Sequence, residues 1–157
     1  MRDVLTKIFK YAKYLDYPLT RGNFLKQYRD VFTMYNDMKD EIENKRFLEY
    51  QMKHIDALNF ETDDYIVVVP TKCNELITEG MNQCNCVGGY VSNVIDHQCN
   101  IVFVRKKSEI EKSYITCEIR NGEIKQFLLK FNNRIYEESD KDFYRLYQEH
   151  LQELWGE

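Results

Sequence analysis

The N-terminal third of the chain carries apolar residues at steps of three and four, the spacing that places side chains on one face of an α-helix. A first stripe lies before Pro18, and a second follows Asn23, a residue type that caps helix N-termini. The stripes consist of Val4, Leu5, Ile8, Ala12 and Leu15, then Phe24, Tyr28, Val31, Tyr35, Met38 and Ile42. We expect the second stripe to pack in the intramolecular core rather than at a dimer interface.

A mixed charge cluster over residues 37–46 separates the second stripe from a further helical pattern at Leu48, Met52 and Ile55. Both signs of charge are interleaved in it, which is typical of a solvated surface. We interpret it as a solvated face or a turn at a helix junction. The pattern as a whole predicts a helical layer over residues 1–58.

The middle of the chain changes to strand patterns. Residues 65–69 are almost wholly β-branched and stop at Pro70, and residues 101–104 lead into Arg105. Between these strands, a short helix with Leu76 and Ile77 facing the core is expected to end at Gly80, and a second short helix to follow Val87.

Asn121-Gly122 is the strongest hairpin signal in the chain, because both residues tolerate the positive φ angles of a two-residue turn. If these two residues form the loop, Ile119 pairs with Ile124 and Cys117 with Gln126. That register places Gln126 on the apolar, inward face of the hairpin. A buried amide needs hydrogen-bond partners, which we expect from the helix over residues 86–95.

These patterns predict an α+β fold: a helical N-terminal layer, a small, mostly antiparallel sheet with inserted short helices, and a C-terminal helix. The last helix is indicated by spacings near one turn at Phe143, Leu146, Tyr147, His150, Leu151 and Trp155. We expect one domain over residues 1–157, composed of the helical layer (1–58), an α+β core (59–135) and the C-terminal helix (136–157).

Composition agrees with a folded domain, since 43% of the 157 residues are hydrophobic and 14% aromatic. The net charge of −4 argues against a protein held on DNA by a global positive field. No apolar run approaches the roughly 18 residues of a membrane span, and charges occur throughout the first 17 residues, so we expect a cytoplasmic protein. The five cysteines are an odd number and suit reduced thiols.

Several separated elements occur in a characteristic order: Cys86-Val-Gly-Gly-Tyr90, a strand ending at Arg105, Cys117-Glu-Ile119 before the turn, Gln126, and Asn132-Asn133-Arg134. This arrangement, over residues 65–135, resembles the PcfJ-like family of proteins from conjugative plasmids, integrative elements and phages. The resemblance implies an accessory role in a mobile genetic element. The family usually has His immediately before this Cys, whereas this chain has Asn85.

Cys86 is the candidate nucleophile of a thiol-dependent enzyme, with Tyr90 and Gln126 holding a substrate. Asn85 cannot accept a proton, so the base would be His97 or another group brought in by the fold. The adjacent Gly88 and Gly89 let a ligand or a strand approach the backbone. The candidate binding residues are Asn85, Gly88, Gly89, Arg105, Glu118 and Asn132.

A structural interpretation of the same residues is favoured over catalysis. In it Cys86 is a small buried hydrophobe, Tyr90 a half-buried aromatic and Gln126 a hydrogen-bonded core amide. Cys84, Cys86, His97 and Cys99 could together ligate zinc. Their one-residue spacings are shorter than those of common structural zinc sites, so we expect no cofactor and favour no metal.

The favoured hypothesis is an accessory protein of a plasmid or phage that binds a macromolecular partner, in DNA transfer or counter-defence. The acidic balance favours a protein partner. Nucleic acid is the alternative, through Arg105, Lys106 and Lys107, although interleaved glutamates suit a solvated charged hairpin. A thiol-dependent enzyme using Cys86 and a small zinc-binding module are the other hypotheses.

Overall fold

The computed structural model describes residues 9–10, 12–13, 15, 17–20 and 22–155. The chain divides into two compact units, Met1–Glu43 and Asn44–Glu157, which are treated separately below. Val4, Leu5 and Ile8, the first residues of the first predicted stripe, lie outside the described residues. The organisation as a single domain stays a prediction.

The first unit contains most of the long helix α2 (Phe24–Lys53), which continues into the second unit. Gln27 fixes the chain before this helix: its carbonyl oxygen accepts from the Thr20 backbone N–H at 2.8 Å, and its amide donates to the Thr20 carbonyl at 3.0 Å. Ala12 and Val31 form a small buried cluster. No described helix is both long enough and apolar enough to cross a membrane.

Two expectations for this region need correction. The charge cluster over residues 37–46 forms no turn, because α2 runs through it without a break. Its exposed members include Lys39, Asp40 and Glu41, which agrees with the interpretation as a solvated face. Met38, placed on the core stripe by its spacing, is 41% exposed.

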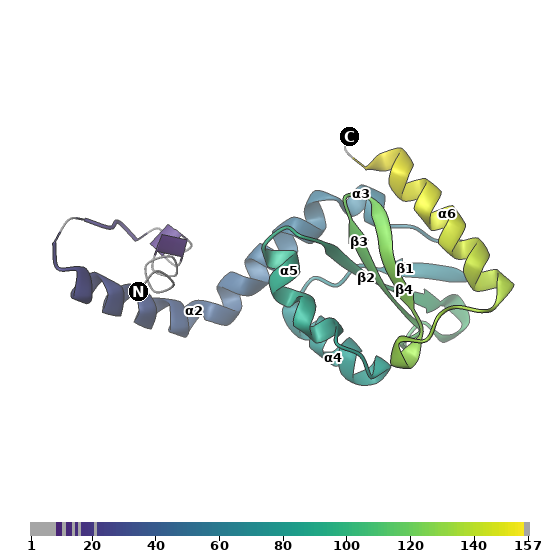
Figure 1. The fold of residues 1–157 in the computed structure, drawn as a ribbon, viewed down its shortest axis with the longest axis horizontal. Coiled ribbons are helices and arrows are strands. Elements are labelled where there is room, and N and C mark those ends of the chain that lie inside the picture. Colours follow the sequence, from purple (N-terminus) through teal and green to yellow (C-terminus); the bar gives the residue numbers. More distant parts are fainter. Residues whose placement is uncertain (1–8, 11, 14, 16, 21, 156–157) are drawn as a thin grey trace. The chain divides into compact units, whose positions relative to one another are not determined.

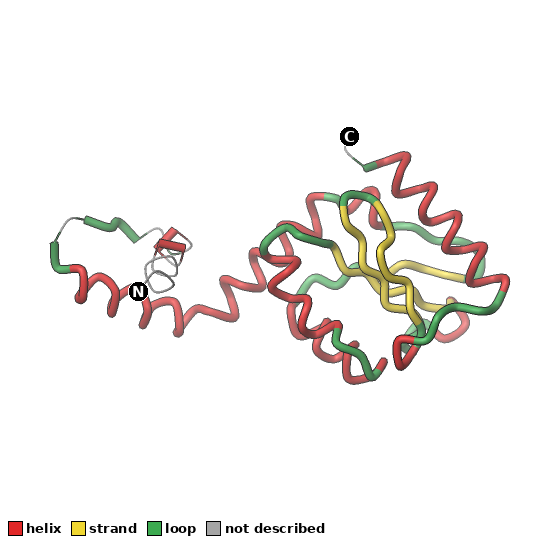
Figure 2. Tube along the Cα trace, viewed as in Figure 1, coloured by secondary structure: helices red, strands yellow, loops and turns green. Residues whose placement is uncertain are grey.

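The second unit is built on a sheet that has, in the described part of the chain, four antiparallel strands in the order β1-β2-β3-β4. The strands are β1 (Tyr65–Val68), β2 (Asn100–Lys106), β3 (Ile115–Arg120) and β4 (Glu123–Leu128). The predicted hairpin is confirmed: Asn121 and Gly122 both have positive φ, 51° and 80°. Figure 2 shows the strands, in yellow, at the centre of this unit with helices around them.

Helices cover both faces of the sheet, so the second unit has three layers (Figure 1). One face packs its β-branched residues against Phe143, Tyr147 and Leu151 of α6 (Glu138–Leu154), with α3 (Ile55–Leu58) alongside. The other face packs against α4 (Cys73–Gln83), the 3₁₀ helix η1 (Val87–Tyr90) and α5 (Val91–Ile95). The predicted α+β fold, with its C-terminal helix, is confirmed.

The C-terminal turns of α2 are tied to β2 by buried amides. Gln51 is fully buried and donates to the Ile101 carbonyl at 2.7 Å, while the Asn100 amide donates to the Gln51 side-chain oxygen at 2.9 Å. Buried amides bonded in this way specify register as well as contributing to stability. The end of α2 is therefore part of the layer that covers the second face.

The hairpin register differs from the prediction because an irregularity lies between Glu118 and Ile119. Ile119 does pair with Ile124, but Glu118 then pairs with Gln126 and Cys117 with Phe127. The extra residue on β4 reverses the faces of all positions beyond it. The expectation that Gln126 is a buried core amide is wrong: Gln126 is exposed and shares a face with Glu118.

Helix α4 does not end at Gly80 but continues to Gln83, where Cys84 adopts a left-handed conformation with φ 52°. Gly80 is instead a close-packing position, since a Cβ there would lie 3.2 Å from the Asn85 carbonyl oxygen. Gly88 is packed in the same way, with Ile77 Cα 3.3 Å from where its Cβ would be. These two approaches hold η1 tightly against α4.

Candidate functional site

A hollow of about 330 Å³ lies between the η1 segment and the second face of the sheet. It brings together side chains from four separate stretches of sequence: the α4–η1 connection with η1, β2, the β3–β4 hairpin, and the 3₁₀ turn η3 (Lys130–Asn132). The lining residues are Asn85, Cys86, Val87, Tyr90, Ile101, Thr116, Glu118, Gln126, Leu128 and Asn132. Six of these are site residues predicted from the sequence.

Glu118 supplies a buried carboxylate to the hollow. The residue is only 6% exposed, and its Oε1 accepts from Arg120 Nε at 2.8 Å. Its second oxygen has no hydrogen-bond partner among the described residues. A buried carboxylate with an unused oxygen gains free energy from a donor, and more from a charged one.

Asn85 stabilises the wall of the hollow. Its side-chain oxygen accepts from the Val87 N–H at 3.0 Å, and its amide nitrogen donates to Thr116 Oγ1 at 3.3 Å. Its own N–H bonds to the Gly80 carbonyl at 3.0 Å. Asn85 therefore joins the end of α4, the start of η1 and β3, which gives this residue a positioning role.

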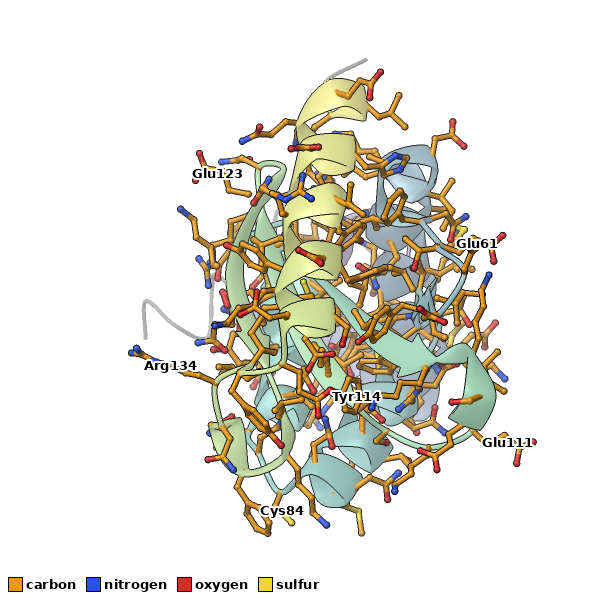
Figure 3. All side chains as sticks on the ribbon, turned by 90° about the vertical axis from the view of Figure 1, so that its right-hand side faces the viewer. Glu61, Cys84, Glu111, Tyr114, Glu123 and Arg134 are labelled. Carbon is orange, nitrogen blue, oxygen red and sulfur yellow. The ribbon has the colours of Figure 1, made fainter. Side chains whose placement is uncertain are left out.

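Cys86 is exposed, so the interpretation of it as a buried hydrophobe is wrong. It comes directly before η1 and lines the hollow together with Tyr90, which is half-buried as expected. Figure 3 shows the neighbouring Cys84 at the opposite end of the unit from Glu123, the first residue after the hairpin turn.

None of the three histidines lines the hollow. His97 stacks on Tyr50 at 4.4 Å between ring centroids, and His54 stacks on Trp155 at 3.9 Å. A proton acceptor for Cys86 would thus be Glu118, the carboxylate among the lining residues, rather than His97.

The opposite rim is formed by Gln126 and Asn132, both exposed. The side chain of neither residue makes a hydrogen bond to another described residue. Asn132 has a φ of 59° and follows Phe131 at 61°, so this turn is built from left-handed residues. Asn133 closes it, since its carbonyl accepts from the Leu129 N–H at 2.8 Å. Two amide groups of the rim are thus available to a ligand.

Arg105, predicted to bind, is not among the residues of the hollow. Its guanidinium forms a salt bridge with Glu79 of α4 at 2.9 Å, and Ser113 donates to the same carboxylate oxygen at 2.5 Å. The side chains of Arg105 and Glu79 are 12% and 2% exposed. This pair joins α4 to β2, and its buried position removes Arg105 from the surface that a phosphate would meet.

The other members of the predicted basic patch also have partners within the chain. Lys107 forms a salt bridge with Glu61 at 2.9 Å, and Lys106 lies over the ring of Tyr114 at 4.4 Å. The hydroxyl of Tyr114 in turn donates to the carboxylate of Asp140, in the first turn of α6. Tyr114 is labelled in Figure 3. The three residues thus form separate intramolecular contacts.

The four candidate zinc ligands are not assembled. Cys84 and Cys86 are exposed, while Cys99 is buried, which raises the pKa of its thiol to about 11. In the part of the chain that the structure describes, no three His, Cys, Asp or Glu side chains come together in a way that could hold a metal ion.

Gly88 and Gly89 line a second, adjoining depression of about 370 Å³, here called the glycine groove. Its lining residues are Ile77, Gly80, Met81, Asn85, Cys86, Gly88 and Gly89. Ile77 was expected to face the core but is 51% exposed, and Met81 is 76% exposed. The spacing of four between them, beside the glycine pair, is the sequence signal that could have identified this surface.

Comparison with known proteins agrees with the resemblance seen in the motifs. A model of the family described as PcfJ-like protein matches residues 1–144. A protein named Uncharacterized protein Lin1253/Lin1744, from Listeria innocua serovar 6a (strain ATCC BAA-680 / CLIP 11262), is 37% identical over 97 residues, covering 60% of this chain. The chain spans about a fifth of that relative's length, 21%. No solved structure matches.

Proposed function

Since this chain belongs to the PcfJ-like protein family, we propose that it is a cytoplasmic accessory protein of a mobile genetic element, a plasmid or phage, that binds a protein partner through the hollow. The process served would be DNA transfer or counter-defence. The mobile-element context rests on the resemblance to proteins of conjugative plasmids, integrative elements and phages.

The observation that carries this proposal is the set of polar groups in the hollow that the fold itself does not use. Gln126 and Asn132 are exposed and make no side-chain hydrogen bond to the described residues, and one oxygen of Glu118 is without a donor. Exposed polar groups of this kind bond to water, which a ligand with matching donors and acceptors can replace. Their gathering around one depression favours such a ligand.

Charge favours a protein over nucleic acid as this ligand. The chain has 26 acidic and 22 basic residues, and the hollow contains a carboxylate but no lysine or arginine among its lining residues. Nucleic-acid affinity depends mainly on neutralising phosphates with Lys and Arg. Because Arg120 already pairs with Glu118, the described residues of the hollow offer a phosphate backbone no free cation. The second oxygen of Glu118 can still accept from a donor of a basic protein segment.

The proposal is tested by isolating the untagged protein from its host and recording a native mass spectrum. The wild type is compared with Gln126→Arg, which adds a guanidinium beside Glu118 and so occupies the hollow. Gln152→Arg, the same change at an exposed position of α6, is the control. We expect a retained protein with the wild type and the control but not with Gln126→Arg. Equal retention by all three forms would reject the hollow as the binding site.

A second candidate function, thiol-dependent catalysis, is favoured by one observation: Cys86 is exposed and lines the same hollow as Glu118. The thiolate would be the nucleophile and Glu118 the proton acceptor. Cys86→Ser and Cys86→Ala separate the two functions. If the hollow serves only to bind a partner, both variants retain that partner. If the Cys86 thiol takes part in a reaction, both variants lose activity in the host.

A further inference from the structure

The hollow and the glycine groove adjoin, because Asn85 and Cys86 line both. Their chemistry differs. The hollow presents the carboxylate of Glu118 with amide groups, and the groove presents the exposed side chains of Ile77 and Met81. A ligand that spans both would need a cationic or donor-rich group next to an apolar one.

The adjacent glycines of the groove, Gly88 and Gly89, have different roles. Gly88 is required by packing, since a Cβ there would lie 3.3 Å from Ile77 Cα. A Cβ on Gly89 would meet nothing within 4 Å, and its backbone is not in the left-handed region. Neither packing nor conformation demands glycine at position 89. The absence of a side chain there leaves the groove open.

The groups in the hollow suit an arginine side chain. A guanidinium offers five N–H donors in a plane, and the available acceptors are the second oxygen of Glu118 and the carbonyl oxygens of Gln126 and Asn132. Tyr90 adds an aromatic ring to the same lining, a partner that guanidinium groups also favour. Lysine would supply the charge and three donors but not the planar group that stacks on an aromatic ring.

We propose that the hollow and the glycine groove together bind an extended segment of a partner protein, with an arginine in the hollow and a neighbouring apolar side chain between Ile77 and Met81. This inference rests on the proposed function, for which it names the chemistry of the partner. It is supported by the carboxylate of Glu118, which keeps one oxygen for a second guanidinium beside Arg120, and by the continuity of the two depressions.

The test uses the full chain and acetyl-Leu-Arg-Leu-amide, which offers a leucine on either side of the arginine. Binding is followed by isothermal titration calorimetry and by ¹H–¹⁵N NMR shifts. The control peptide carries citrulline, a neutral analogue of arginine with the same shape. We expect saturable binding, shifts at the lining residues of both depressions, and about tenfold or greater weakening with citrulline or with Glu118→Gln.

Gly89→Leu tests the groove separately. It places an apolar side chain at a position where an added Cβ meets nothing within 4 Å. We expect this variant to bind acetyl-Leu-Arg-Leu-amide about tenfold more weakly and to bind the weaker ligand acetyl-Ala-Arg-Ala-amide as the wild type does. Because Glu118→Gln could disturb the pair with Arg120, Gln126→Arg serves as a second hollow variant, and circular dichroism checks the fold of each.

Equal binding of the arginine and citrulline peptides, shifts outside the two depressions, or absence of saturation at millimolar concentration would overturn the inference. If adenosine monophosphate binds in the hollow more strongly than acetyl-Leu-Arg-Leu-amide does, the hollow is a nucleotide site and the inference is overturned as well. Peptide binding without any retained partner in the host would reject the proposed function alone. If the host partner is lost with Gln126→Arg but the citrulline peptide binds as well as the arginine peptide, the proposed function stands. Only the assignment of an arginine to the hollow is then rejected.

Discussion

The salt bridge between Arg105 and Glu79 gives the sharpest test of which predicted residues are structural. Replacing Arg105 with Met keeps much of the volume of the side chain and removes its charge. The Glu79 carboxylate, 2% exposed, then retains the Ser113 hydroxyl at 2.5 Å but loses its cation. The variant therefore contains a buried charge without compensation, between α4 and β2.

Removing one partner of a buried ion pair typically costs about 3–5 kcal/mol, mostly because the other charge remains desolvated. The upper part of this range applies to fully buried pairs. Because the Arg105 side chain is 12% exposed, we expect the free energy of unfolding to fall by about 3 kcal/mol. Replacing both residues with Met removes the stranded charge, and such hydrophobic replacements are often neutral. The double variant should therefore be more stable than Arg105→Met.

Urea unfolding, followed by the fluorescence of Trp155 and by circular dichroism, measures these differences. A loss below about 1 kcal/mol, typical of exposed pairs, would refute the structural role and return Arg105 to the binding residues.

Three further changes test the second unit. Phe143→Ala removes a ring that is 2% exposed under the sheet, and urea unfolding should show a loss of about 3–5 kcal/mol. Burial, aided by a hydrogen bond to a carboxylate of α6, raises the pKa of Tyr65 from 10.0 to about 12. Below pH 10 the hydroxyl is protonated in both states, and above it only the unfolded chain ionises, so the free energy of unfolding should fall between pH 10 and 12 and fall less in Tyr65→Phe. Iodoacetamide followed by mass spectrometry should label Cys86 in the native protein, whereas the buried Cys99 and Cys117 should react only after unfolding.

Much of the fold followed from local pattern. Period-two and β-branched runs located the strands, and Asn121-Gly122 located the hairpin, because these signals depend on neighbouring residues alone. The continuity of α2 through residues 37–46 could not be predicted from local pattern. Its charged residues at 37–46 look like a junction in sequence, but a helix tolerates them wherever that face is solvated.

The position of Gln126 shows where pattern fails. A single irregularity beside Glu118 reverses the faces of β4, and nothing in the local sequence marks it. The hollow itself was only partly predictable. The motif residues Cys86, Tyr90 and Asn132 were identified. The pairing of Arg105 with Glu79 was not, because these two residues lie 26 positions apart in the sequence and meet only where α4 packs on β2.

The role of the hollow can be measured by placing a photoreactive benzoylphenylalanine at Gln126, which is exposed on its rim, and irradiating the protein in its host. The same amino acid at the exposed Gln152 of α6 is the control. We expect a crosslink from position 126 but not from position 152, joined to a peptide of one partner protein that carries arginine beside an apolar residue. No crosslink at position 126, or the same products from both positions, would contradict binding through the hollow.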